Sequence, residues 1–297
     1  LDRLESFNPQ ELSNTLLAFA KAGESDPRLF EKVADHILAL NNLKDFAPQA
    51  FSNIVLAYAK AEEPHPALFE KVANHIVALD NLGAFDAQTL ANTVWSFATA
   101  GVSHPHLFEA IADHIIALDQ LNEFIPQNLS NTVYAFAKAG ESQPALFDKV
   151  ANHIVALDHL NDFGSQELCN TVWAFAKAGQ SHPALFEKVA THILSLDDLN
   201  SFNAKNCSQI LWGYGTAKII NHQLFETVAK YAMSHIDYKS LDKNDQLSLL
   251  RAFQKAENAH DEKRNASKKL REVERKIEEL EAKIAELKVD NEREADK

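Results

Sequence analysis

The fold is decided by residues 158–196, which read DHLNDFGSQELCNTVWAFAKAGQSHPALFEKVATHILSL. Related sequences begin at Asp2, Asn41, Asp80 and Asp119, so each unit starts 39 residues after the one before it. A degenerate copy begins at Asp197. Self-similarity at a fixed period of this length is typical of repeat proteins, in which like units stack on one another. We therefore expect a tandem repeat array.

Each unit is predicted to contain two helices. The first covers a segment resembling PQxLSNTVWAFAKA and ends at a glycine, the residue type that best tolerates the left-handed conformation after a helix. Unit 2 has Glu62 at this place, so we expect its turn to close differently. The second helix begins near a proline and places Leu-Phe, Val, Ile and Leu at helical spacing. The expected helix ends are Gly23, Gly101, Gly140 and Gly179, and the expected N-caps of the second helices are Ser25, Ser103, Ser142 and Ser181, with His65, His104 and His182 as further capping residues.

These units predict an all-α fold, an α-solenoid of tandem 39-residue two-helix repeats with a C-terminal coiled-coil helix. One helix pair cannot bury both of its apolar faces, and stacking of neighbours buries them and creates an extended, curved surface. Strand alternation and hairpin turn pairs are missing from the sequence. The expected solenoid domain covers 1–257, with units at 2–40, 41–79, 80–118, 119–157, 158–196 and 197–236 and a capping helix at about 241–257.

Residues 258–297 have a different period. Apolar residues alternate there by three and four, with one asparagine in register, and Ile at position a with Leu at d favours a parallel dimer. The alternatives are a single solvated helix or a helix that packs back on the solenoid. The predicted seam consists of Leu270, Val273, Ile277, Leu280, Ile284, Leu287 and Asn291.

The charge of the chain is uneven. The net charge is −13, and residues 1–196 hold 23 Asp or Glu against 11 Lys or Arg. This acidity weighs against non-specific nucleic-acid binding, which depends on Lys and Arg displacing counterions. Two cysteines, Cys169 and Cys207, suit a reducing compartment, and no apolar run approaches the length of a membrane helix. Since Leu1 is the last residue of a unit, we expect the chain to begin within a longer array, with any targeting segment outside it.

Motifs for catalysis, cofactors and metals are missing. The sequence has no glycine-rich phosphate loop, no His-Glu-x-x-His and no cysteine pair at metal spacing, so we expect a binding protein rather than an enzyme. One histidine recurs in the second helices of units 1 to 5, but neighbouring units lie about 10 Å apart, which is too far for one zinc ion. We expect these imidazoles to be half-buried by packing. They are His36, His75, His114, His153 and His192.

Packing does not require the polar row that recurs on one face of the first helices. The row consists of positions 9, 13, 16 and 20 of each unit, where the first residue of the unit is position 1. Helical spacing places these four positions on one face. Most units place an amide, a second amide, an aromatic or apolar side chain and a cation there. The row is Gln10, Asn14, Leu17 and Lys21; Gln49, Asn53, Leu56 and Lys60; Gln88, Asn92, Trp95 and Thr99; Gln127, Asn131, Tyr134 and Lys138; Gln166, Asn170, Trp173 and Lys177; and Lys205, Gln209, Trp212 and Thr216.

Two interpretations of this row remain open. Amides can read base edges, aromatic faces can stack bases and Lys can meet phosphate, which suits single-stranded RNA at about one nucleotide per unit. In the alternative, the Asn and Gln side chains bond the neighbouring unit as a ladder that holds the stack together, and the aromatic side chains are buried between units.

The block PQxLSNTxWAFAKAG, seen at 126–140 and nearly so at 165–179, resembles the octotricopeptide repeat and related arrays of organellar RNA-associated proteins with RAP domains. The resemblance covers about residues 1–236 and implies paired antiparallel helices in a superhelix. It also implies binding of RNA in a mitochondrion or chloroplast, for RNA maturation, stability, translation or ribosome assembly. No RAP domain is visible in this chain. The competing hypothesis is a protein-interaction scaffold, in which an acidic solenoid is dimerised by the coiled coil and docks a basic partner.

Overall fold

The computed structural model describes residues 4–24, 26–141, 143–237, 241–242, 245–256, 258 and 261. These residues form helices and connecting turns and contain no strand, which confirms the all-α repeat architecture. None of the helices in this part of the chain is both long and apolar enough to cross a membrane. The predicted coiled-coil seam lies outside the described residues, so dimerisation through it stays a prediction.

The described chain starts with a short 3-10 helix, η1 (Leu4–Ser6). Each unit then contains a first and a second helix. The first helices are α1 (Pro9–Ala22), α3 (Pro48–Lys60), α5 (Ala87–Ala100), α7 (Pro126–Ala139), α9 (Ser165–Lys177) and α11 (Ala204–Ala217). The second helices are α2 (Pro27–Ala39), α4 (Pro66–Val77), α6 (Pro105–Ala117), α8 (Pro144–Ala156), α10 (Pro183–Leu194) and α12 (His222–His235).

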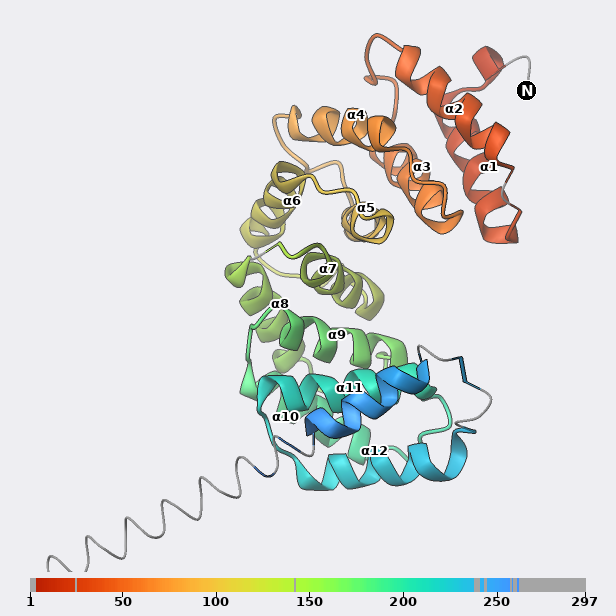
Figure 1. Ribbon diagram of the computed structural model, residues 1–297. Helices are drawn as coiled ribbons and strands as arrows, with labels where there is room; N and C mark the ends of the chain where they lie inside the picture. The colour runs from red at the N-terminus through yellow and green to blue at the C-terminus, as the bar shows by residue number, and fades with distance from the viewer. Residues whose placement is uncertain are drawn as a thin grey trace, which may run out of the picture.

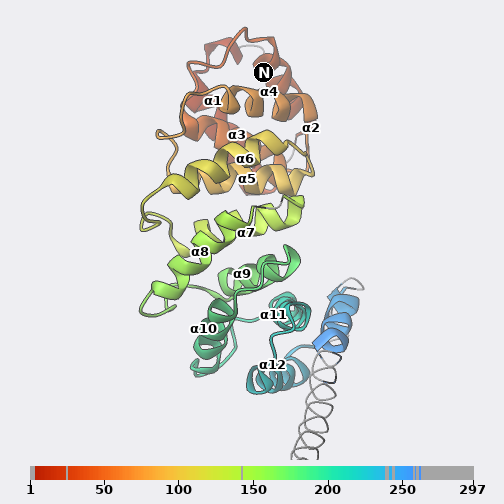
Figure 2. The ribbon, with the colours of Figure 1, turned by 90° about the vertical axis from the view of Figure 1, so that its left-hand side faces the viewer.

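The units stack into a curved ladder with the two kinds of helix in separate layers. Successive first helices pack closely along their length, whereas successive second helices approach each other at fewer points. Because one layer is packed more tightly than the other, the array bends toward it, and the first helices lie on the inner side of the curve (Figure 1). The view turned by 90° shows α6, α8 and α10 in front, on the outer side (Figure 2).

A repeated pair of aromatic rings joins each unit to the next. The ring of Phe69 in α4 meets that of Phe97 in α5 edge-on, with centroids 4.9 Å apart, and both side chains are fully buried. Tyr replaces Phe in units 2 and 6, where the hydroxyls of Tyr58 and Tyr214 donate 2.6 Å hydrogen bonds to main-chain carbonyls of the preceding second helix. Phe19, the equivalent residue of unit 1, is 40% exposed because no earlier second helix is described beside it. These rings are part of the core.

The turn between the two helices of a unit closes in one way in units 1 to 5. Gly23, Gly101, Gly140 and Gly179 have φ values between 67° and 76°, as expected for glycine after a helix. The expectation that unit 2 closes differently is wrong, because Glu62 itself adopts a left-handed φ of 57°. The N–H of Glu63 donates a 3.1 Å hydrogen bond to the carbonyl of Tyr58, the same closure as at the glycine turns, although a β-carbon makes the left-handed conformation unfavourable.

The expected serine N-caps of the second helices are also wrong where the structure describes them. Ser103 and Ser181 lie one residue too early, and the cap is the residue that directly precedes the proline. In α4, α6 and α10 this residue is a histidine, as predicted, and its Nδ1 accepts a hydrogen bond of 3.2–3.3 Å from the main-chain N–H three residues later. Asp26 and Asn221 cap α2 and α12 with their side-chain oxygens. The first residue of α2, α4, α6, α8 and α10 is a proline, which has no N–H that would need a partner.

A lysine in the second helix, not singled out from the sequence, ties neighbouring units together. The Nζ of Lys71 donates to the carbonyls of Leu38 (2.8 Å) and Leu40 (2.5 Å), at the end of the preceding second helix. Lys149 bonds Ile116 and Leu118 in the same way, and Lys188 bonds Val155 and Leu157. A cation at a helix C-terminus satisfies unpaired carbonyls and interacts favourably with the helix dipole.

The preceding second helix ends differently depending on whether this lysine is present. Where it is present, the C-cap is an extended leucine, with ψ between 133° and 143° at Leu40, Leu118 and Leu157. Units 3 and 6 have Ala110 and Thr227 at the equivalent place, and α4 and α10 instead end one residue earlier, at C-caps with ψ near 0°. The ammonium group thus accompanies one of two helix endings.

A terminal helix at 245–256 packs against α11, near the place predicted for a capping helix (Figure 1). Leu249, Ala252 and Ala256 are buried there. A β-carbon built on Gly215 of α11 would lie 2.9–3.0 Å from the main chain of Ala256, so glycine is required for this close approach. This position is alanine in units 2 to 5, whose first helices pack against another first helix instead.

Candidate nucleic-acid interface

The polar row predicted from the sequence is the exposed stripe of the inner helix layer. In α5, α7 and α9 most of the residues outside this row are buried against the second helices or the neighbouring first helices. The amides at the first position of the row are exposed throughout units 1 to 5, and so are the cations. The exposed members are Gln10, Gln49, Gln88, Gln127 and Gln166, with Lys21, Lys60, Lys138, Lys177 and Lys205.

The second amide of the row becomes more buried along the array. Asn14 is exposed; Asn53, Asn92 and Asn131 are half-buried; and Asn170 is buried. Nδ2 of Asn53 donates a 3.2 Å hydrogen bond to Oδ1 of Asn14, and Nε2 of Gln209 donates one of 3.0 Å to Oδ1 of Asn170. At these two steps the amides bond between units, as the ladder interpretation predicts. Gln209 is also buried, so this last pair is withdrawn from the surface.

The aromatic side chains of the row stack on one another in units 4 to 6. The ring centroids of Tyr134 and Trp173 are 4.9 Å apart at 38°, and those of Trp173 and Trp212 are 6.1 Å apart at 32°. All three are half-buried. A base between two rings needs about 7 Å, which is two van der Waals contacts. Bases therefore have no room to enter this stack ring by ring, and the expected reading of one nucleotide per unit does not fit the geometry in units 4 to 6.

The lysines of the row lie beside these rings. Nζ of Lys60 is 5.6 Å from the centroid of the Trp95 ring, and Nζ of Lys138 is 5.9 Å from that of Tyr134. Both distances fall within the range of cation–π attraction. Partial burial lowers the pKa of Lys138, and the positive charge of Lys205 lowers it further. Among the described residues, no carboxylate forms an ion pair with Lys60, Lys138 or Lys205.

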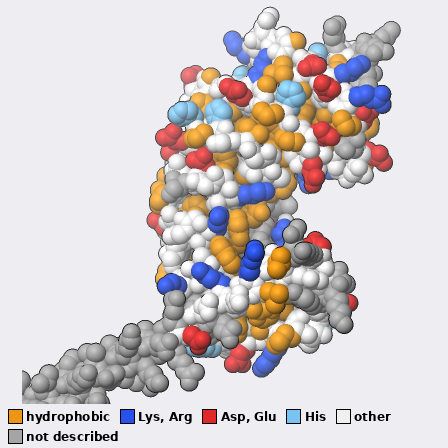
Figure 3. Space-filling view, viewed as in Figure 1, with side chains coloured by type: hydrophobic (Ala, Val, Ile, Leu, Met, Phe, Trp, Pro, Cys, Tyr) orange, Lys and Arg blue, Asp and Glu red, His pale blue; other side chains and the backbone are white. Residues whose placement is uncertain are grey.

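Charge is separated between the two layers. The six first helices contain five lysines and only two acidic residues, Glu11 and Glu167. Almost all the remaining carboxylates of the described residues belong to the second helices and the turns. In the space-filling view, Lys and Arg side chains gather over α7 and α9 beside an apolar strip, and the surface is hollowed between the first and last units (Figure 3). The net charge of −13 therefore does not describe the inner surface.

Other features of the structure are explained by packing. The recurring histidines His36, His75, His114, His153 and His192 are half-buried, as expected. Burial lowers the pKa of His75, His114, His153 and His192. His75 packs against Phe51, with ring centroids 4.9 Å apart. Within the described part of the chain, no group of three or more His, Cys, Asp or Glu side chains could hold a metal ion.

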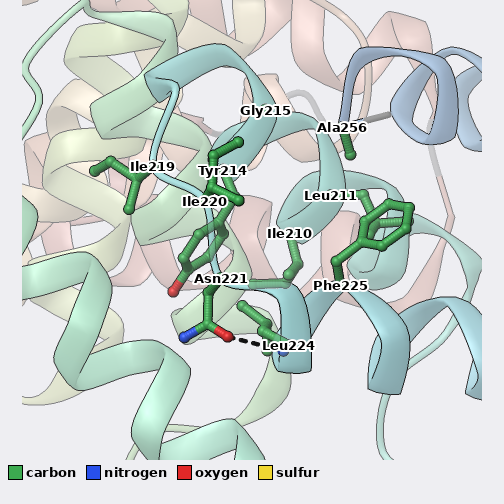
Figure 4. A pocket seen from close by; sticks show the side chains of 10 residues that line it. All are labelled: Ile210, Leu211, Tyr214, Gly215, Ile219, Ile220, Asn221, Leu224, Phe225 and Ala256. Atoms are coloured by element: carbon green, nitrogen blue, oxygen red, sulfur yellow. Dashed lines mark hydrogen bonds between the residues drawn. The ribbon is translucent and has the colours of Figure 1, made fainter. Parts of the chain in front are cut away.

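A small cavity lies between α11, α12 and the terminal helix, and its lining is almost entirely apolar (Figure 4). The side-chain oxygen of Asn221 there accepts a 2.9 Å hydrogen bond from the N–H of Leu224, at the start of α12. The Tyr214 hydroxyl bonds the carbonyl of Phe186. Both groups hold helices in place, so the cavity offers little for recognition of a ligand, and the inner row remains the candidate site.

Comparison with known proteins bears on what this row contacts. No curated protein gives a significant match to the chain. A family model described as RNA-editing substrate-binding complex 6 protein matches residues 41–274, well over half of the sequence. The matched region begins with unit 2 and includes every aromatic member of the row, Trp95, Tyr134, Trp173 and Trp212. The chain with its lysine-lined inner surface thus belongs to the RNA-editing substrate-binding complex 6 protein family.

Proposed function

We propose that the solenoid binds single-stranded RNA along the row of its inner helices and works as a binding component of an RNA-editing substrate-binding complex, without catalysing a reaction itself. The observation that carries this proposal is the separation of charge. A chain with a net charge of −13 presents unpaired lysines, exposed amides and aromatic rings on the inner surface of its repeat array. This combination is typical of proteins that bind single strands.

The family description supports this function, because it names the substrate of RNA editing. The resemblance of the LSNTxWAFAKAG block to octotricopeptide repeats supports it independently of the family match. On both grounds we propose a mitochondrial location. The outer layer, which carries most of the carboxylates, is then free to contact proteins of the complex. Dimerisation through the predicted seam at 270–291, which lies outside the described residues, stays a prediction.

The test measures RNA affinity by fluorescence anisotropy at several salt concentrations, with a labelled single strand of mixed sequence and a duplex of equal length. The variant Lys21→Ala/Lys60→Ala/Lys138→Ala/Lys177→Ala removes four row cations. For single strands, each lost phosphate contact flattens the slope of log K against log salt by about 0.7, so we expect a flattening of up to about 3.

The matched control removes four exposed cations outside the row, Arg28, Lys44, Lys230 and Arg251, and so makes the same change in net charge. We expect the control to retain most of the wild-type affinity and slope. If the wild-type chain binds no RNA, or if the row variant and the control behave alike, the row is not the RNA-binding surface.

A further inference from the structure

We infer that the RNA is held chiefly over α7, α9 and α11, where its phosphates meet Lys138, Lys177 and Lys205 and its bases lie against the outer edges of a closed aromatic stack. We refer to these three lysines together with Tyr134, Trp173 and Trp212 as the C-terminal patch. This inference rests on the proposed function and adds where the strand binds and how it is read.

The first ground is the asymmetry of the row. Units 1 and 2 place Leu17 and Leu56 at the aromatic position, so the first half of the inner surface has no ring stack of this kind. Trp95 in unit 3 forms no ring contact with another described aromatic residue and lies beside Lys60 instead. The continuous run of ring contacts from Tyr134 through Trp173 to Trp212 belongs to units 4 to 6 alone. Base–aromatic contact adds a sequence-tolerant contribution to single-strand binding, so this half is favoured.

The second ground is the arrangement of cations around the stack. Lys138 lies over the ring of Tyr134, and Lys205 is close enough to lower the pKa of Lys138. Lys177 is exposed at the end of α9 between them in the stacking order. None of the three is paired with a carboxylate of the described residues. Like charges held together without a counter-charge favour a bound anion, and a strand with one phosphate per nucleotide supplies several.

The third ground concerns how bases are read. The rings of the C-terminal patch already contact one another, so a base cannot enter between them without separating the helices. The amides at the same end, Asn170 and Gln209, are buried and bonded to each other, and at that step they have no surface from which to read a base edge. At the aromatic position and the position after it, the exposed groups are ring edges and ammonium groups, neither of which distinguishes one base from another. The exposed amides of units 4 and 5, Gln127 and Gln166, lie about two helical turns before the rings. Binding by the C-terminal patch is therefore led by phosphate and tolerant of sequence.

The experiment compares two double variants that remove equal charge from equivalent repeat positions. Lys138→Ala/Lys177→Ala removes two cations of the C-terminal patch, and Lys21→Ala/Lys60→Ala removes their counterparts in units 1 and 2. All four side chains are exposed, so both variants should fold, which far-ultraviolet circular dichroism checks. Anisotropy is measured with labelled oligonucleotides of twelve uridines, cytidines or adenosines at about 0.1 M salt, and with polyglutamate as a competitor.

We expect the first variant to bind at least tenfold more weakly, with a salt slope flatter by about 1.4, and the second to lose less than threefold. The three oligonucleotides should bind the wild-type chain within about threefold of one another. Equal losses in the two variants, discrimination of more than tenfold among the bases, or displacement by polyglutamate at equal charge concentration would each overturn this inference. Those outcomes leave RNA binding itself intact, whereas a wild-type chain that binds none of the oligonucleotides contradicts the proposed function.

Discussion

The side-chain amide of Gln209 donates a 3.0 Å hydrogen bond to the side-chain oxygen of Asn170, which lies 39 residues earlier at the same position of the preceding unit. Both side chains are buried between α9 and α11. The bond shows how a polar row can serve packing at one end of an array while remaining exposed at the other, where Asn14 and Asn53 make a similar bond at the surface. Its energetic effect can be measured.

Replacing Asn170 by Ala should destabilise the solenoid by about 1–3 kcal/mol, because the buried amide of Gln209 loses its partner. Urea unfolding followed by tryptophan fluorescence measures this effect. Asn14→Ala is the control at the equivalent position of unit 1, where water replaces the lost bond, and it should cost less than about 0.5 kcal/mol. A similar cost at both positions would mean that burial does not govern the contribution of this row.

Introducing a lysine at Ala110 should stabilise the array by about 1 kcal/mol. In units 2, 4 and 5 the equivalent ammonium bonds two carbonyls at the end of the preceding second helix, and the residues at the matching distances from 110 are Val77 and Leu79. The reverse change, Lys188→Met, retains most of the aliphatic stem and should cost about 1–3 kcal/mol. Urea midpoints report both changes. If Ala110→Lys gives no gain, the ending of α4 does not adapt to the cation.

Glu62→Gly should raise the free energy of unfolding by about 0.5–1 kcal/mol. Glu62 is exposed with φ of 57°, and glycine adopts this conformation without the steric cost of a β-carbon. Thermal unfolding by circular dichroism gives the shift in Tm. The neighbouring change Glu63→Gly, at a residue that does not have a positive φ, should lower Tm through the added freedom of the unfolded chain. A lower Tm for Glu62→Gly would show that the turn is not strained.

Thr99→Lys should strengthen RNA binding about three- to tenfold at low salt. Units 2 and 4 have a lysine at the last position of the row, and unit 3 has Thr99 there instead. One more phosphate contact should steepen the salt slope by about 0.7. The Thr99 hydroxyl is buried with no hydrogen-bond partner among the described residues, so its removal should not cost stability. Thr99→Met adds comparable length without charge and serves as the control. Equal gains from Met and Lys would assign the effect to packing.

Acid should destabilise the array from about pH 6.5 downward. Burial lowers the pKa of His75, His114, His153 and His192 below the ordinary value of 6.5, so the unfolded chain takes up protons at a higher pH than the folded chain does. The stability is therefore complete above pH 6.5 and declines as pH falls through the lowered values. Urea midpoints between pH 7.5 and pH 5 measure the decline. Replacing the four histidines by Gln should flatten it, and an unchanged profile would assign it to other groups.

Much of this architecture is local and follows from the sequence. Leu-Phe, Val and Ile at helical spacing form the buried face of each second helix, and four of the first-helix ends carry the glycine that the left-handed turn favours. The period of 39 residues indicates that equivalent helix faces of successive units pack on one another. The all-α repeat fold and the existence of an inner row can therefore be predicted without coordinates. Even the histidine caps are decided within four residues. The lysine of the LFEKVA block repeats with the same period, and its replacement by Ala110 in unit 3 is visible in the sequence, but the carbonyls that this lysine bonds are not.

What only the tertiary structure decides is the distance and rotation between units. These determine that Tyr134, Trp173 and Trp212 close on one another, that Asn170 and Gln209 are buried together, and that Lys138 and Lys205 come near each other although they lie two units apart. A repeat sequence specifies which face meets its neighbour, but the spacing at each junction depends on how both layers pack, including residues such as Gly213 and Gly215 that permit close approach in the last unit. How exposed each row residue is therefore depends on the packing at the junctions between units, which the sequence of one unit does not determine.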